Sequence, residues 1–119
     1  MDAFEKLDVW KRSARMCVEV FKALENTREF SFRDQIFRAS LSIPSNIAEG
    51  YERGSPKEFK RFLGIAKGSC AEVRAQLYIG RETKILPDQL ARTLIRETRE
   101  LSKMLQGLIK TLKTEQHYL

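Results

Sequence analysis

The densest group of chemically capable side chains in this sequence lies between residues 35 and 53. Amide, hydroxyl, guanidinium and carboxylate groups recur there at steps of three and four, which places them on one face of a helix. This polar face consists of Gln35, Arg38, Ser42, Asn46, Glu49 and Arg53. Such a face forms either a ligand or catalytic patch or an internal network that fixes helix register, with Arg38 and Glu49 expected to pair across it. We favour the internal network, because polar groups near a helical proline often satisfy freed backbone groups.

Catalytic chemistry has few other candidates. The one histidine, His117, stands close to the last residue, and Cys17 and Cys70 form no Cys-x-x-Cys pair. Glycine-rich phosphate loops and zinc-protease motifs are absent from the sequence. Some four-helix-bundle ribonucleases use an arginine that precedes a histidine by a few residues. This pair is missing here, because positions 110–112, upstream of His117, hold no arginine. A metal-dependent nuclease using Glu49 and Glu52 stays open, but we expect no enzyme, no cofactor and no metal site.

Basic residues recur on the two segments that follow. Lys60, Lys67, Arg74 and Arg81 repeat every seven residues, with Tyr78 nearby, and a second line contains Arg92, Arg96, Arg99, Lys103 and Lys110. The second line would extend over about 30 Å, comparable to roughly nine base pairs. Two such lines on consecutive helices would form one cationic surface for phosphate binding. The alternative is a solvated outer face, which any helical bundle needs.

Composition limits the elements that carry these residues. The chain has 119 residues, of which 42% are hydrophobic and 32% charged, with a net charge of +6. These values predict a single domain over residues 1–119 with one core. We expect a cytoplasmic protein without membrane contact, because no apolar segment suits a signal peptide or a membrane span and the two cysteines indicate a reducing compartment.

Hydrophobic periodicity predicts four helices, at about residues 3–25, 32–52, 56–83 and 87–114. Asp2 and Ser31 are the expected caps of the first two helices, and Ser55, Pro56 and Glu58 form a strong start signal for the third. Pro44 falls inside the second helix, where we expect a kink or a break. Short connections between long helices predict an all-α, antiparallel up-down-up-down bundle.

The first helix carries two adjacent apolar lines. The line assigned to the core contains Ala3, Leu7, Trp10, Ala14, Cys17, Phe21 and Leu24, at alternating steps of four and three. The second line, Val9, Met16 and Val20, exceeds what one bundle core requires. These three residues are therefore the candidates for an oligomer interface, unless the bundle itself buries them.

Several segments also carry a family resemblance. They are Leu7-x-Val9-Trp10-Lys11, Gln35-x-x-Arg38-Ala39-x-x-Ser42-Ile43-Pro44-Ser45-Asn46-Ile47-Ala48-Glu49-Gly50, Ser55-x-Lys57-Glu58-Phe59-x-x-Phe62-Leu63-x-Ile65-Ala66-x-Gly68-Ser69 and Glu72-Val73-x-x-Gln76-Leu77. Covering about residues 4–86, they resemble the bacterial four-helix-bundle family encoded within intervening sequences of 23S rRNA genes.

The resemblance implies a bundle that assembles into homo-oligomers, typically a ring of five. It also implies similarity to the accessory protein of diversity-generating retroelements, a basic pentamer that binds nucleic acid and a reverse transcriptase. Five copies with a charge of +6 each would carry about +30, so weak phosphate contacts would add up.

Two non-catalytic functions follow as alternatives. In the first, an oligomeric bundle binds structured RNA or DNA mainly through phosphates, using the two basic lines. In the second, the protein is a scaffold for another protein, such as a polymerase, and has no direct role with nucleic acid. Its docking surface would then be the part of the polar face formed by Arg38, Asn46, Glu49 and Arg53.

Overall fold

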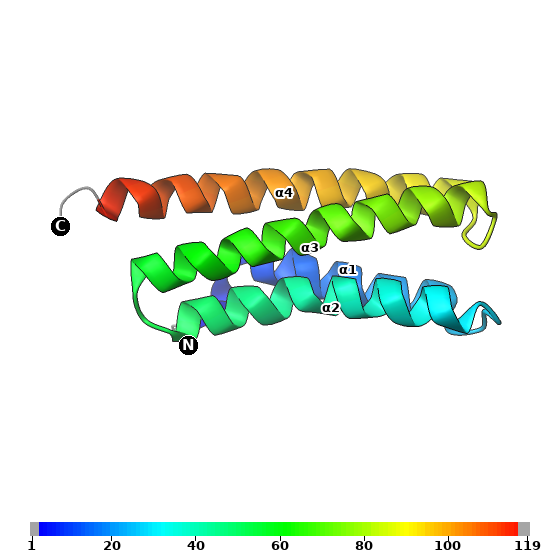
Figure 1. Cartoon of the computed structure of the whole chain (residues 1–119), viewed down its shortest axis with the longest axis horizontal. Helices are drawn as coiled ribbons and strands as arrows, with labels where there is room; N and C mark the ends of the chain where they lie inside the picture. Colours follow the sequence, from blue (N-terminus) through cyan, green and yellow to red (C-terminus); the bar gives the residue numbers. More distant parts are fainter. Residues whose placement is uncertain (1–2, 117–119) are drawn as a thin grey trace.

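Four long helices form an antiparallel up-down-up-down bundle, which confirms the predicted all-α fold (Figure 1). The structure, a computed structural model, describes residues 3–116, with side chains described up to residue 112. A short 3₁₀ turn, η1 (Phe4–Lys6), precedes four helices: α1 (Asp8–Leu24), α2 (Phe30–Glu52), α3 (Pro56–Glu82) and α4 (Asp88–Gln116). No β-strand occurs within residues 3–116.

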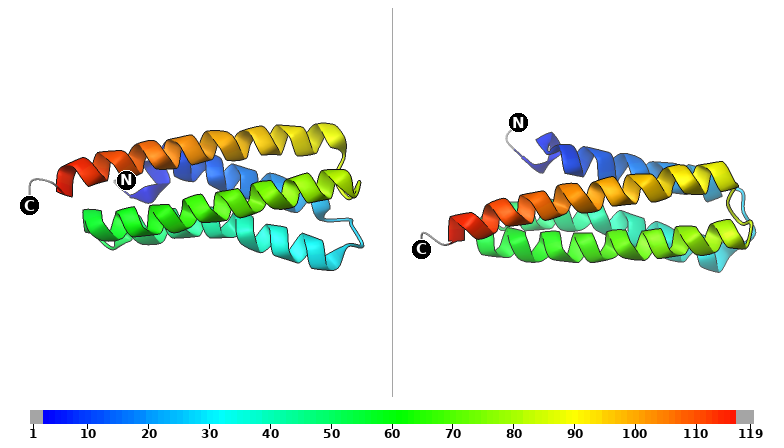
Figure 2. Two further views of the ribbon diagram at one scale, coloured as in Figure 1. Left: turned by 45° about the horizontal axis from the view of Figure 1, so that its top comes forward. Right: turned by 90° about the horizontal axis from the view of Figure 1, so that it is seen from above.

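The bundle is long and narrow, with principal extents of 51 × 23 × 20 Å. The α1–α2 and α3–α4 turns lie at one end, and the α2–α3 turn lies at the other (Figure 1). Each helix packs against its neighbour in sequence, and α4 also packs against α1 (Figure 2). This order pairs α1 with α2 on one side of the molecule and α3 with α4 on the other.

The start of α3 agrees with the start predicted from the sequence, whereas the starts of α1 and α2 differ from those predicted. The Ser55 hydroxyl accepts a hydrogen bond from the Glu58 backbone N–H at 3.1 Å, and Pro56 opens α3 as predicted. The first long helix begins at Asp8 rather than near residue 3, because Leu7 has an extended backbone that separates η1 from α1. Helix α2 begins at Phe30, so Ser31 lies inside it and does not cap it. The expected Asp2 cap lies outside the described residues.

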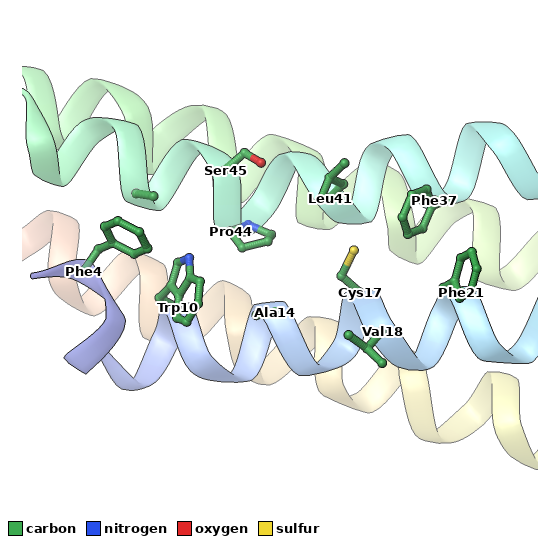
Figure 3. A pocket seen from close by; sticks show the side chains of 11 residues that line it. Phe4, Trp10, Ala14, Cys17, Val18, Phe21, Phe37, Leu41, Pro44 and Ser45 are labelled. Atoms are coloured by element: carbon green, nitrogen blue, oxygen red, sulfur yellow. The ribbon is translucent and has the colours of Figure 1, made fainter.

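Pro44 does not break α2, which continues as a helix on both sides of it. Of the two outcomes expected at Pro44, a kink or a break, the break does not occur. The proline ring is buried on the side of α2 that faces α1 (Figure 3). Burial of the ring against another helix compensates for the backbone hydrogen bond that a proline cannot donate.

Two contacts between helices fix how α2 lies against α3 and how α1 lies against α4. Gly50 of α2 lies against α3 so closely that an added Cβ would lie 2.5 Å from the Cβ of Phe62. Across the bundle, Arg12 of α1 forms a two-point ion pair with Glu97 of α4, with N–O distances of 2.6 and 3.0 Å. The first contact needs a residue without a side chain, and the second fixes α1 to α4.

Candidate functional site

The two predicted basic lines meet along the boundary between α3 and α4. Two hydrogen bonds join them: Lys67 Nζ donates to Gln106 Oε1 at 2.6 Å, and Arg99 Nη2 donates to the Tyr78 hydroxyl at 2.6 Å. We call this region the basic surface; it comprises Lys60, Lys67, Arg74, Arg81, Arg92, Arg96, Arg99, Lys103 and Lys110. Its five α4 members are exposed, and helical spacing places them opposite the buried leucines of α4. The expected juxtaposition of the two lines is thus present.

Acidic neighbours hold some of these cations only weakly. Asp88 lies between two of them, 2.7 Å from Arg81 and 2.7 Å from Arg92, and Lys103 lies 4.0 Å from Glu100. All of these pairs involve exposed carboxylates, and exposed pairs contribute about 0–1 kcal/mol. The cations can therefore exchange such partners for phosphate oxygens at little cost.

Arg96 occupies the edge of the basic surface that faces α1. It lines a shallow hollow together with Arg12, Arg15 and Glu100. Among the described side chains, Arg96 forms one hydrogen bond, a long one of 3.4 Å to the Thr93 hydroxyl. Arg96 is therefore available to a ligand approaching α4 from outside.

The polar face of α2 is divided between an internal network and an outer ion-pair chain. The Ser42 and Ser69 hydroxyls lie 2.8 Å apart and join α2 to α3, while the Asn46 amide donates to the Ser42 hydroxyl and carbonyl. These contacts support the structural interpretation of the network. Glu49 pairs with Arg53 at 2.9 Å and not with Arg38, since positions four apart adjoin on a helix.

Arg38 lies at a small hollow of about 310 Å³ between α2 and α3, lined also by Gln35, Ser42, Ser69 and Glu72. Its guanidinium is exposed and has no hydrogen-bond or ion-pair partner among the described residues. Of the six polar-face residues, Arg38 and Gln35 are thus the two that are exposed and have no polar contact with a described residue.

No metal site is found in the described part of the chain: no three His, Cys, Asp or Glu side chains gather there. His117 lies outside the described residues. Both cysteines are free and buried, and burial raises the pKa of the Cys17 and Cys70 thiols above its ordinary value. A raised pKa lowers the thiolate fraction, so these cysteines act as core residues at neutral pH.

The predicted oligomer interface on α1 was wrong. Val9, Met16 and Val20 are at most 5% exposed, because this line faces the interior of the bundle and forms part of its core. The line that had been assigned to the core is divided: Cys17 and Leu24 are buried as expected, whereas Phe21 is 50% exposed.

An apolar groove consequently runs along the outside of α1 and α2 (Figure 3). It has a volume of about 510 Å³ and is lined by Phe4, Trp10, Ala14, Cys17, Val18, Phe21, Phe37, Leu41, Pro44, Ser45 and Ala48. Val18, Phe21 and Leu41 are 46–51% exposed, and the Phe21 and Phe37 rings lie 5.5 Å apart across the groove. An apolar surface of this kind indicates a site for protein association.

Comparison with known families decides where the chain belongs. The model of the 23S rRNA-intervening sequence protein family matches residues 5–107. The chain belongs to this family. The match spans the apolar groove except Phe4 and the basic surface except Lys110.

A solved structure agrees with this membership. A protein of unknown function from the S23 ribosomal protein family of Bacteroides thetaiotaomicron shares 24% sequence identity, with a TM-score of 0.80 over 86% of this chain and 98% of that one. At this identity the likeness shows the shared fold. No curated protein matches the chain.

Two features of this member of the 23S rRNA-intervening sequence family were missed in the sequence. One is the α2 side of the groove, whose residues Phe37, Leu41, Pro44 and Ala48 recur at steps of four and three. That spacing was a usable signal. The other is the Tyr78 contact with Arg99, which depends on how α3 and α4 are aligned and has no local signal.

None of the helices, as far as they are described, is long and apolar enough to cross a membrane.

Proposed function

We propose that this chain is a non-catalytic, self-associating cytoplasmic protein that binds RNA or DNA through the basic surface. The observation that carries the proposal is the joining of the α3 and α4 basic lines by the Lys67–Gln106 and Arg99–Tyr78 contacts. A cationic surface about 30 Å long suits the regularly spaced phosphates of a nucleic acid. Phosphate contacts of this kind read shape and charge rather than base sequence.

Self-association would multiply these contacts. The apolar groove supports it, with a second copy of the chain as the occupant. Charges of both signs border the groove on each helix: Lys11, Glu19 and Lys22 on α1, and Asp34, Arg38 and Glu52 on α2. Helices of a second copy would thus meet apolar and complementary charged groups together. The family resemblance favours a ring of five, in which every copy would present its basic surface.

The nucleic-acid proposal predicts that a double charge reversal, Arg96→Glu with Lys103→Glu, weakens binding roughly tenfold at low salt and flattens its salt dependence. Both residues are exposed and their contacts are weak, so the fold should persist. Fluorescence anisotropy with a labelled structured RNA at several salt concentrations measures both effects. Each lost phosphate contact should reduce the slope of log K against log salt by about 0.7–0.9.

The matched control is Arg28→Glu with Arg38→Glu, which changes net charge equally but off the basic surface. Equal weakening by both double variants would show that only net charge matters and would contradict the assignment. Absence of salt-dependent binding by the unmodified protein would contradict the proposed function itself.

A further inference from the structure

Tyr78 is an aromatic side chain placed within the basic surface. It is 39% exposed, while the other exposed aromatic rings among the described residues, Phe21 and Phe30, lie on α1 and α2. The Tyr78 hydroxyl accepts the hydrogen bond from Arg99 Nη2 at 2.6 Å. This bond brings the Arg99 guanidinium to the hydroxyl end of the ring at the boundary of α3 and α4.

Further arginines flank the ring along α3. Arg74 lies one turn before Tyr78 and makes no hydrogen bond or ion pair with a described residue. Arg81 lies one turn after it and shares Asp88 with Arg92 of α4. The acidic groups nearest in the helix pattern are Asp88, already bound by these two arginines, and the exposed Glu82. The partly exposed ring therefore has an arginine one turn to either side of it along α3, and Arg99 of α4 contacts its hydroxyl.

This combination matches the chemistry of single-stranded nucleic acid. In a duplex the base faces are stacked on one another, so a protein ring on the surface has no base to contact. An unpaired base can stack on an exposed aromatic ring while neighbouring phosphates bind nearby cations. A guanidinium next to the ring adds a favourable contact to the same base.

We propose that Tyr78 stacks on an unpaired base, with Arg74 and Arg99 binding the adjoining phosphates. The site therefore selects single-stranded segments of RNA or DNA over duplex. This inference rests on the proposed function, because it assigns a substrate class to the same basic surface.

The test compares a labelled oligouridine with an RNA duplex of equal length in anisotropy titrations at fixed salt. The unmodified protein should bind the single strand more tightly than the duplex. Tyr78→Ala should weaken single-strand binding by about 5- to 150-fold, the range for loss of one stacked base, and should weaken duplex binding far less. Because Tyr78→Ala removes no charge, the salt dependence should not change.

Two further variants make the result specific. Tyr78→Phe keeps the ring and should retain most of the single-strand affinity. Phe30→Ala removes an even more exposed ring from α2 and should have no effect. Circular dichroism confirms that each variant keeps its helices. Unchanged single-strand binding by Tyr78→Ala, or an equal loss with Tyr78→Phe, would overturn the stacking proposal while salt-dependent binding persists. Loss of that binding in the unmodified protein would instead overturn the proposed function.

Discussion

Asp88 is the residue that most directly links α3 to α4 by charge. One carboxylate oxygen accepts from Arg92 Nε and the other from Arg81 Nε, each at 2.7 Å. Hydrogen bonds from Arg92 and then Arg81 hold the pKa of the Asp88 carboxyl below its ordinary value. Asp88 also opens α4, where a negative charge interacts favourably with the helix dipole.

This arrangement predicts a pH dependence of stability. Since the folded-state pKa of Asp88 is lowered, its contribution is present above the unfolded pKa of about 3.9 and is lost as pH falls through the folded value. Asp88→Asn should therefore reduce the difference in unfolding free energy between neutral pH and about pH 3. Urea denaturation at the two pH values measures this difference. Glu52→Gln, an exposed carboxyl outside any ion pair given for the described residues, is the control; equal effects of both variants would contradict the prediction.

For individual residues, the sequence predicted the exposed charged side chains and the Ser55 helix cap correctly. The basic lines and the Ser55 cap follow from spacing alone and are present in the structure. The Arg38–Glu49 pair was wrong because a nearer partner, Arg53, lies one turn from Glu49. The Tyr78–Arg99 contact could not be predicted, because it joins residues on different helices.

Helix packing depends on Gly50 at the scale of elements. An added Cβ there would lie 2.5 Å from the Phe62 Cβ and 3.2 Å from a ring carbon of Phe59. The Cβ of Phe62 is fixed to the α3 backbone, so it cannot move without moving the helix. Close approach of α2 and α3 at this end therefore requires glycine.

Gly50→Ala should destabilise the protein by about 1–3 kcal/mol, because α2 and α3 must separate to admit the methyl group. Gly68→Ala is the matched control within α3, where an added Cβ meets nothing within 4 Å. Alanine favours helix more than glycine does, so this second variant should gain about 0.5–1 kcal/mol. Thermal and chemical denaturation measure the loss of stability in Gly50→Ala and the gain in Gly68→Ala. A Gly50→Ala protein as stable as the original would refute the packing argument.

Helix number and approximate bounds were predictable from periodicity, but the orientation of α1 was not. Its two apolar lines differ little in hydrophobicity, and both could face a core. Docking against the rest of the bundle buries Val9, Met16 and Val20, and in the other line it buries Leu24 but leaves Phe21 half exposed. That selection depends on three other helices and is not encoded within α1 alone.

The whole molecule separates two surfaces on different helix pairs. The apolar groove belongs to α1 and α2, and the basic surface belongs to α3 and α4. Figure 1 shows these pairs as the lower and upper halves of the bundle. Self-association through the groove would therefore leave the basic surface free.

Self-association predicts a specific response to a charge placed in the groove. Leu41→Glu should convert the assembly to a single chain of 13.8 kDa, because the buried carboxylate would lack a partner in the interface. Light scattering of the unmodified protein should give a multiple of this mass, five times for a ring of five. Ile79→Glu alters an exposed apolar residue of α3, away from the groove, and should leave the assembly intact. A single-chain mass for the unmodified protein would contradict self-association through this groove.

The single tryptophan of the chain stands at the end of the groove, where the Trp10 ring meets the Phe4 ring edge-on at a centroid distance of 5.1 Å. Its indole thus senses the polarity of that one surface. A neighbour seated in the groove would exclude water from the indole and shift its emission to shorter wavelength, whereas nucleic acid on α3 and α4 would not. The protein thereby contains its own optical reporter of assembly, separable from ligand binding without any added label.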